Sequence, residues 1–152
     1  MDSCFRGNDR YLNTMVVTKH LLVETRGNTD VIDITSDCRK IVEKAELNSG
    51  CVTIFNPGST GALTTIEYEP NLVKDLENAL EIWAPSDKVY EHARTWHDDN
   101  GFSHVRSSLM GPFITVPFEN KELTLGTWQQ IVFCDFDTRP RKRRLVVQII
   151  GE

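Results

Sequence analysis

The sequence predicts an α+β fold in which two β-sheets pack as a sandwich, accompanied by about two or three helices. Segments with strand composition recur along the chain, about seven or eight in all. They are clustered and do not alternate strictly with helical segments, which argues against a parallel α/β sheet. A chain of 152 residues has the length of one domain, and a domain of that size buries roughly two thirds of its unfolded surface. The sequence therefore indicates a single domain.

The first half of the domain is expected to combine strands with two amphipathic helices. The first helix follows Thr35, Ser36 and Asp37, which have the composition of a helix cap, and its apolar positions continue to Leu47. The second helix begins at Pro70, a residue favoured in a first helical turn, and extends over residues 70–83. The strands expected here are residues 16–24, 31–34, 51–55 and 63–68.

The second half begins with a stretch that lacks a clear period and ends in strands. Residues 90–101 are polar and aromatic, and no regular element is predicted there. A short helix is expected over residues 103–110, because Gly111 and Pro112 then end it. The remaining strands are predicted at residues 113–118, 123–125, 128–136 and 145–150.

Residues 1–14 differ from the rest of the chain. They are polar, have neither helical nor strand periodicity, and lack the apolar core of a signal peptide. Met15 then opens directly into an alternating strand segment. We expect the domain to span residues 15–152, with residues 1–14 as a disordered tail or an over-extended start.

The composition excludes several classes of protein. The formal net charge of −5 argues against a nucleic-acid binder, which would present a broad basic face. No apolar run approaches the roughly 20 residues that span a bilayer, so we expect no membrane insertion. The chain is therefore predicted to bind neither nucleic acid nor membrane.

The cysteines predict a reducing compartment. The four cysteines are scattered without a C-x-x-C pair, so neither a disulfide framework nor a zinc finger is indicated. Cys51 and Cys134 lie in apolar runs and are predicted to be small core residues. Reduced thiols are typical of the cytoplasm, where we expect the protein to be located.

Three of the four histidines, His92, His97 and His104, lie close together in the sequence. They are predicted to bind a divalent metal such as Mg²⁺ or Zn²⁺, because imidazole is a good ligand and nearby carboxylates ligate or orient it. Asp98 and His104 are candidate catalytic residues. The spacing matches no closed zinc motif, so ordinary surface histidines are the alternative, and residues 98–101 are also a turn signal.

A loop rich in glycine and hydroxyl groups follows the predicted strand at 51–55. It contains Ser59 and Thr60, and the backbone N–H groups of such a loop can point at an anion. It lacks the lysine and the spacing of a Walker loop. Such a sequence is more often a simple tight turn, and the functional alternative is a loop that binds phosphate through Ser59 and Thr60.

A basic run interrupts this acidic chain. Arg139, Arg141, Lys142, Arg143 and Arg144 lie within six positions. Arginine offers a planar fork of donors, so Arg139 and Arg141 are predicted to bind phosphate or carboxylate. The alternative is a solvated strand entry that deters edge pairing.

Two further candidate regions lie in or between predicted strands. Gly126, Thr127 and Gln129 form a connection where the backbone can approach a ligand closely, and Trp128 is expected in core or interface packing. Glu67 lies in an apolar and aromatic strand. If it faces a pocket, it is a candidate for acid–base catalysis; simple alternation would instead expose it.

These pieces occur in the order found in the YjbQ-like family, which the sequence resembles from about residue 15 to residue 152. The most specific stretch runs from Ser107 to Phe118 (SSLMGPFITVPF) and is followed by LTLGTWQ at 123–129. The C-terminal segment beginning with Asp135-Phe136-Asp137, residues 50–67 and residues 100–104 also match the pattern.

The resemblance implies an α+β sandwich that assembles as a homotrimer. It also implies the activity of a secondary thiamine-phosphate synthase, a weak transferase that joins a pyrimidine pyrophosphate to a thiazole phosphate and releases pyrophosphate. A small phosphorylated molecule would then be held by the loop at Ser59 and by Arg139 and Arg141. His97, Asp98, Asn100 and His104 would line the site, with Glu67 nearby and a divalent cation neutralising the pyrophosphate.

Two positions depart from the family pattern. Gly58 stands where many members carry a histidine, and Phe102 stands where a histidine is expected in close relatives. The histidine site is then expected to depend on His97 and His104. Two other functions suit the same residues: a trimeric protein that binds a metal or an anionic ligand without catalysis, and a metal-assisted phosphate ester hydrolase.

Overall fold

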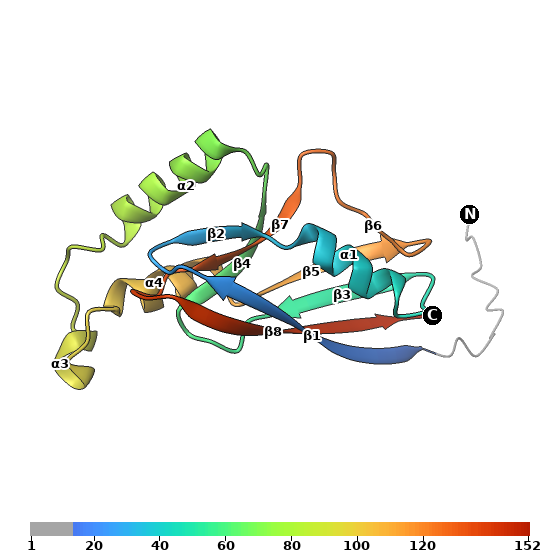
Figure 1. Ribbon diagram of the computed structural model, residues 1–152, viewed down its shortest axis with the longest axis horizontal. Coiled ribbons are helices and arrows are strands. Elements are labelled where there is room, and N and C mark those ends of the chain that lie inside the picture. Colours follow the sequence, from blue (N-terminus) through green and yellow to red (C-terminus); the bar gives the residue numbers. More distant parts are fainter. Residues whose placement is uncertain (1–13) are drawn as a thin grey trace, which may run out of the picture.

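The computed structural model describes residues 14–152 and places eight strands and four helices in them (Figure 1). The strands are β1 (Met15–Thr25), β2 (Asp30–Asp33), β3 (Gly50–Phe55), β4 (Gly61–Ile66), β5 (Phe113–Glu119), β6 (Glu122–Leu123), β7 (Gln130–Asp135) and β8 (Arg141–Gly151). The helices are α1 (Thr35–Glu43), α2 (Pro70–Trp83), α3 (His92–Trp96) and α4 (Gly101–Met110). The predicted α+β class is confirmed, whereas the predicted tail, apart from Thr14, lies outside the described residues.

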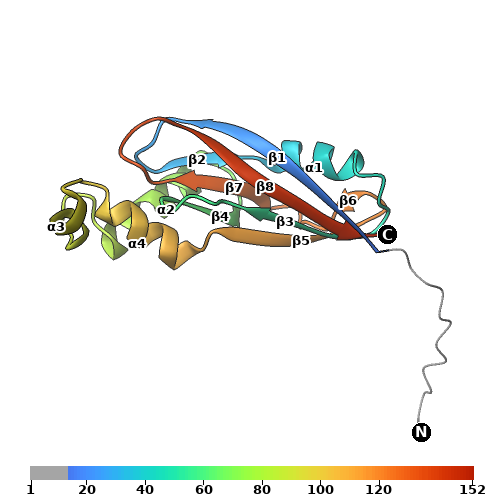
Figure 2. The same cartoon turned by 90° about the horizontal axis from the view of Figure 1, so that it is seen from below.

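The strands form two antiparallel sheets that pack against each other (Figure 2). One sheet has the strand order β1-β8-β3-β5-β6 and the other has the order β2-β7-β4. β8 pairs with β1 from Met15↔Gly151 to Thr25↔Arg141, and its other edge pairs with β3. The last strand in the sequence therefore lies inside the larger sheet.

The main core fills the space between the two sheets and α1. It includes Ile34, Cys38, Val42, Val52, Ile54, Leu63, Val116, Phe118, Ile131, Phe133, Leu145, Val147 and Ile149. A second apolar cluster lies on the other face of the three-stranded sheet, where Leu80 of α2 packs against Val132, Cys134 and Phe136. The smaller sheet is thus buried on both faces, which explains why residues 131–134 are all buried and form one apolar run.

The outer face of the larger sheet is uncovered by other described residues. Strand alternation places Val16, Leu22, Phe55, Phe113 and Ile150 on this face, and all five are exposed. Cys51 shares this face because it pairs with Ile150, and it is exposed. The prediction that Cys51 is a core residue was therefore wrong, whereas Cys134 is buried and its burial raises the pKa of its thiol to about 12.

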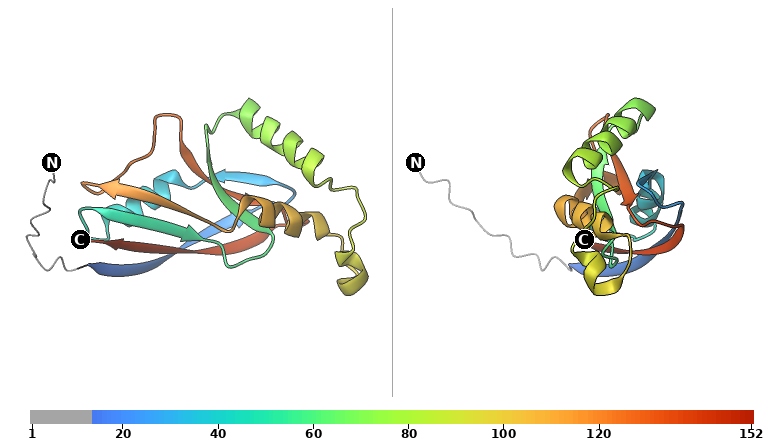
Figure 3. Two further views of the ribbon diagram at one scale, coloured as in Figure 1. Left: turned by 180° about the vertical axis from the view of Figure 1, so that it is seen from behind. Right: turned by 90° about the vertical axis from the view of Figure 1, so that its left-hand side faces the viewer.

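The helices are positioned by caps and packing. The carboxylate of Glu69 accepts hydrogen bonds from the amides of Asn71 and Leu72 at the start of α2. Just before α1, the Asp33 carboxylate accepts a hydrogen bond from the Thr35 amide at 2.8 Å. From behind, α2 extends away from the sandwich, and α3 lies beyond it (Figure 3). None of the helices described in residues 14–152 is long and apolar enough to cross a membrane.

We expect Val132→Ala to lower the free energy of unfolding by about 2 kcal/mol, because two buried carbon atoms are lost and a cavity remains. Val132 is 0% exposed. Val89→Ala is the matched control, since Val89 is 85% exposed and should change stability by less than about 0.5 kcal/mol. Urea denaturation measures both, and equal effects would contradict the described burial of the smaller sheet.

Candidate functional site

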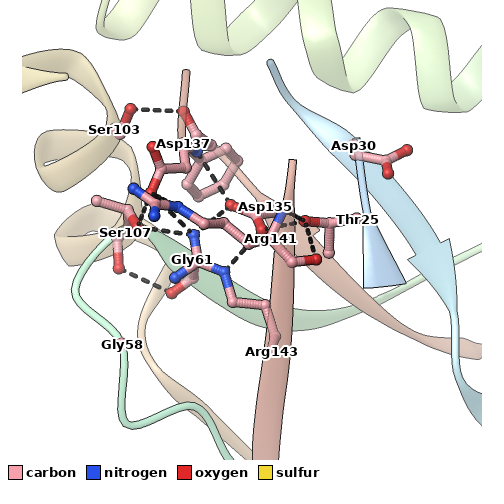
Figure 4. Close-up of polar contacts among 12 residues, drawn as sticks. Thr25, Asp30, Gly58, Gly61, Ser103, Ser107, Asp135, Asp137, Arg141 and Arg143 are labelled. Carbon is pink, nitrogen blue, oxygen red and sulfur yellow. Dashed lines mark hydrogen bonds and ion pairs between the residues drawn. The ribbon is translucent and has the colours of Figure 1, made fainter. Parts of the chain in front are cut away.

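A buried ion pair joins the two sheets at one end of the sandwich (Figure 4). Asp135 ends β7 and is 0% exposed. Arg143 of β8 donates from Nε to Asp135 Oδ2 at 2.7 Å and from Nη2 to Oδ1 at 2.6 Å. This bidentate geometry is the strongest form of arginine–carboxylate contact. Because the partners belong to different sheets, the pair fixes how the sheets meet.

A second buried carboxylate, Asp137, extends this ion pair. Its Oδ2 accepts from Arg141 Nε at 2.9 Å, and Arg143 Nη2 lies 3.3 Å from the same atom. Burial alone would raise the pKa of Asp137, but the hydrogen bond and charge of Arg141, the Thr138 amide and Arg143 outweigh it and hold the pKa below its usual value. Asp137 is thus a carboxylate at neutral pH.

Two threonine hydroxyls complete the network. Thr25 Oγ1 donates to Asp135 Oδ2 at 2.6 Å, and Arg143 Nη2 donates to Thr60 Oγ1 at 2.9 Å. Thr60 is itself buried. The predicted ligand-binding hydroxyl of Thr60 is therefore engaged inside the protein, whereas its neighbour Ser59 is exposed.

Arg141 is the part of the network that reaches solvent. Its side chain is 43% exposed, and its guanidinium contacts Asp137 through Nε. Within residues 14–152 the two terminal nitrogens of Arg141 make no hydrogen bond, so they can receive an anion. Arg139 is exposed nearby in the sequence. Arg143, by contrast, is committed to the buried carboxylates.

Asn56, a residue that sequence reasoning missed, holds the glycine-rich loop. It is 2% exposed. Its Nδ2 donates to the carbonyls of Gly58 and Gly61 at 2.9 Å each, and its Oδ1 accepts from the Gly58 amide at 3.1 Å. The amides of Ser59 and Thr60 donate no hydrogen bond to the rest of the described chain. The loop therefore combines a fixed shape with free N–H groups, as an anion-binding loop requires.

The helix that carries His104 is tied to this end of the sandwich by serine hydroxyls. Ser103 Oγ donates to the Phe136 carbonyl at 2.5 Å, and Ser107 Oγ donates to the Gly61 carbonyl at 2.8 Å. Both serines are buried on α4. Since Phe136 and Gly61 adjoin the ion-pair network and the loop, α4 places His104 beside them.

Buried Arg106 fixes the other side of α4. Its guanidinium donates to the Ala84 carbonyl and to Thr29 Oγ1, and it forms an ion pair with Glu81 of α2 at 2.7 Å. The ring of Phe102 lies 4.9 Å from its guanidinium carbon. Phe102 is therefore a buried packing residue, and its departure from the family pattern removes no side chain from the groove described next.

The histidine groove lies over α3 and α4. It has a volume of about 510 Å³ and is lined by Tyr90, His92, His104, Val105, Ser108 and Leu109, among others. The imidazole rings of His92 and His104 are 4.4 Å apart between centroids. His92 Nε2 lies 3.6 Å from Asp98 Oδ2. With its amide nitrogen turned toward Asp98, Asn100 donates to both carboxylate oxygens at 3.2 and 3.3 Å.

His104 is held mainly in the neutral form. Burial lowers its pKa, and the nearby His92 lowers it further, while the charges of Asp98 and Asp137 act in the opposite direction. The net pKa of His104 is below its ordinary value. At neutral pH its imidazole therefore offers one N–H donor and one nitrogen acceptor.

The three histidines predicted to bind a metal do not converge. His97 ends α3 in a left-handed conformation, with φ of 56°, and is exposed. The close pair is His92 with His104, not His97 with His104 as expected. Among the residues that the structure describes, no three histidine, cysteine or carboxylate side chains are grouped to hold a metal ion. The predicted metal site does not fit one chain alone.

The remaining candidates lie at the other end of the smaller sheet. Glu67 follows β4 and is exposed, as are Gly126, Thr127, Trp128 and Gln129 before β7. β4 begins at Gly61, opposite Asp135, and ends at Ile66, opposite Gln130. The two ends of β4 are roughly 17 Å apart at the usual rise per residue. One chain therefore separates Glu67 and the 126–129 loop from the His104 end.

The residues that sequence reasoning missed are mostly buried polar groups. Asp135, Asp137 and Arg143 were not named as site residues, although two carboxylates spaced two apart at the end of an apolar strand are a usable signal. Ser103, Ser107 and Arg106 gave no such signal. Their roles depend on which backbone carbonyls face α4 after folding.

The sequence matches the family described as UPF0047 protein YjbQ-like over residues 19–152. A UPF0047 protein of Methanothermobacter thermautotrophicus is 37% identical over 137 residues, covering 90% of this chain and 94% of the relative. One from Archaeoglobus fulgidus is 36% identical over 130 residues, covering 86% and 98%.

Solved structures show the same fold. A protein of unknown function from Sulfolobus solfataricus, described as YbjQ-like, has a TM-score of 0.86 at 28% identity, with 91% of this chain and 99% of that chain covered. A protein of the yjbq/upf0047 family from Clostridium acetobutylicum has a TM-score of 0.78 at 31% identity, covering 86% and 98%.

We expect Arg143→Met to lower the free energy of unfolding by about 3 kcal/mol at pH 7, because Asp135 is left buried without its partner. In the wild type the pKa of Asp137 is lowered, so its stabilising contribution is present above about pH 4 and is lost as the pH falls through the lowered pKa. The part of the deficit that comes from the lost contact between Arg143 and Asp137 should therefore shrink in acid.

Arg144→Met is the matched control, since Arg144 is exposed on the opposite face of the same strand. Urea denaturation between pH 7 and pH 3 measures both variants. A deficit that is independent of pH would show that Arg143 acts by packing and not by charge.

Proposed function

Since this chain belongs to the YjbQ-like family, we propose that it binds a phosphorylated small molecule where Arg141, the glycine-rich loop and His104 come together. The proposed reaction is that of a weak transferase of the thiamine-phosphate synthase type, which joins a pyrimidine pyrophosphate to a thiazole phosphate. The observation that carries the proposal is the exposed guanidinium end of Arg141. It is anchored to Asp137, and the charge of the same carboxylate reaches His104.

Phosphate oxygens would bind the free donors at this end of the sandwich. The terminal nitrogens of Arg141 present two parallel N–H groups, the geometry that suits a phosphate. The Ser59 amide and hydroxyl lie on the loop held by Asn56. Arg139 adds a second exposed positive charge. These groups would bind phosphate by charge-assisted hydrogen bonds. Little rearrangement is needed, because Asp137 already holds Arg141 and Asn56 already holds the loop.

The main requirement of the reaction is that the negative charge on the leaving group is stabilised. It does not need a general base. The thiazole nitrogen carries no proton, and its lone pair forms the new bond to the pyrimidine methylene carbon. The bond from that carbon to the pyrophosphate oxygen breaks, and pyrophosphate leaves with the electron pair. Neutral His104 would donate an N–H to a pyrophosphate oxygen. Asp98 contacts His92 and Asn100 and would hold these two side chains in position in the groove.

A divalent cation remains a prediction. When bound, Mg²⁺ or Zn²⁺ would neutralise charge on the departing pyrophosphate. In one chain the donor set is His92, His104 and Asp98, which are not grouped as a metal site within residues 14–152. No step of the proposed reaction is therefore assigned to a metal.

We also propose that the protein assembles as a homotrimer and is located in the cytoplasm. The exposed face of the larger sheet supports contact between copies. Val16, Leu22, Phe55, Phe113 and Ile150 are exposed on this face and have no apolar layer over them in residues 14–152. Apolar surface of this kind is characteristic of protein interfaces.

Binding without catalysis is the second candidate function. Two carboxylates and two guanidiniums balance one another in the network. Arg139 is exposed beside this network and adds one further positive charge to it. Such a site suits retention of an anion better than rapid expulsion of a highly charged leaving group.

Arg141→Ala should weaken the binding of inorganic pyrophosphate by about 10-fold or more, because it removes a charged hydrogen-bond donor worth roughly 1.5–3 kcal/mol. Titration calorimetry measures the affinity. Arg144→Ala removes an exposed charge from the same basic run and should have little effect. If both variants bind as the wild type does, the basic run is only solvated surface.

His104→Ala should lower the rate of thiamine phosphate formation by about 100-fold, a typical loss when a hydrogen-bond donor to developing negative charge is removed. The exposed residue Lys121, on the turn between β5 and β6, lies outside the proposed site and provides the control Lys121→Ala. Thiamine phosphate and pyrophosphate are quantified together. Pyrophosphate binding without product favours the binding protein, and phosphate release from simple esters favours a hydrolase.

A further inference from the structure

The candidate site of one chain is divided into two halves. The histidine groove and Arg141 lie at one end of the smaller sheet, and Glu67 with residues 126–129 lies at the other. In Figure 1 the connection before β7 projects from the top of the sandwich, whereas α3 and α4 lie at its left-hand end. β4 keeps the halves roughly 17 Å apart, so no side-chain rotation can unite them within one chain.

The half that contains Glu67, here called the distal surface (Glu67, Gly126, Thr127, Trp128 and Gln129), has the form of a preformed contact. Gln129 Oε1 accepts from the Gly126 amide at 2.9 Å, and the Gln129 amide donates to the Gly126 carbonyl at 3.0 Å. These bonds hold the loop while leaving Trp128 70% exposed. A rigid loop that presents a tryptophan is typical of an interface anchor.

The charge of Glu67 is also unmatched. Its carboxylate makes no hydrogen bond or ion pair with the rest of residues 14–152. The neighbouring Tyr68 amide is bound to Gln130 Oε1 at 2.9 Å, which fixes the chain where Glu67 emerges from β4. The distal surface therefore offers one acceptor carboxylate beside one large aromatic ring.

The histidine groove offers the complementary groups. The imidazole nitrogens of His104 make no hydrogen bond within the described chain, and a neutral imidazole supplies an N–H donor. Beside it, Val105 and Leu109 are exposed on α4. The groove thus presents a hydrogen-bond donor next to an apolar surface. The donor can bind the carboxylate of the distal surface, and the apolar surface can pack against its indole ring.

We infer that the distal surface of one copy of this chain enters the histidine groove of a second copy, so that Glu67 and Gln129 of one meet His92 and His104 of the other. Trp128 would pack on Val105 and Leu109, and Glu67 would accept from His104 and join His92 and His104 as a third potential metal-binding side chain. The inference rests on the proposed function only in that the same residues form the site.

This arrangement accounts for two observations that a single chain leaves separate. Residues 14–152 contain no grouped set of three metal-binding side chains, and two candidate regions for one site lie at opposite ends of β4. Both follow if the complete site exists between copies. The site would then be absent from an isolated chain even though that chain is folded.

Cross-linking tests the contact without relying on activity. Thr127→Cys and Ser108→Cys are introduced together in a chain in which Cys4 and Cys51 are replaced by Ser; Cys38 and Cys134 are buried and are kept. Both new positions are exposed, and Ser108 lines the groove. A short bismaleimide should link chains into covalent oligomers, while either cysteine alone should give much less product.

The matched control replaces Thr127→Cys with Lys121→Cys, an exposed position on the turn between β5 and β6. Covalent oligomers that form equally with this control, or that do not form at all with Thr127→Cys and Ser108→Cys, would overturn the inference. A protein that remains monomeric at all concentrations in light scattering would also overturn it.

Complementation provides the second test. His104→Ala chains and Glu67→Gln chains are coexpressed with different tags, and the mixed oligomers are isolated. If the site is shared between copies, the mixture should regain Zn²⁺ binding that each variant lacks, because some contacts pair an intact Glu67 with an intact His104. No regain would support a site within one chain. Specific cross-links without any turnover in the wild type would refute the transferase while leaving the shared site established.

Discussion

The pairing of Arg143 with Asp135 is the interaction on which the rest of this end of the molecule depends. A fully buried carboxylate is tolerated only with a charged partner and further hydrogen bonds, and here Thr25 and Arg143 supply them. Because the carboxylate belongs to one sheet and the guanidinium to the other, this requirement fixes the sheets relative to each other. Asp137, Arg141 and the glycine-rich loop then take their positions from the same network.

The site is consequently built from buried supporting residues, the exposed donor Arg141 and the half-buried donor His104. Ser103, Ser107 and Arg106 attach α4 through backbone carbonyls, and Asn56 holds the loop in the same way. Arg141 and His104 are left at the surface of this frame. Rigid support of a few exposed groups is what a small binding site needs for affinity, since little ordering is required when the ligand arrives.

Much of the fold could be predicted from local pattern, but the site could not. The stripe of α2 and the alternating strands are periodic, whereas α3 has five residues, too few to show a helical period. The predicted end of α1 at residue 47 was too late, because Leu47 continues the apolar pattern after the helix stops at Glu43. Pairing of His92 with His104, and separation of both from Glu67, depend on the position of α3 and on the β4–β7 register, which no local pattern encodes.

The central place of β8 has a consequence for how the chain reaches its native state. The larger sheet cannot close until residues 141–151 are available, since they lie between β1 and β3. β1 is synthesised before β8, and the residues that pair are more than a hundred positions apart in the sequence, as in Met15↔Gly151. Such distant pairing is slow and exposes an unpaired strand edge during synthesis. A ribosome-bound chain that lacks its last strand would therefore expose strand edges to which chaperones could bind.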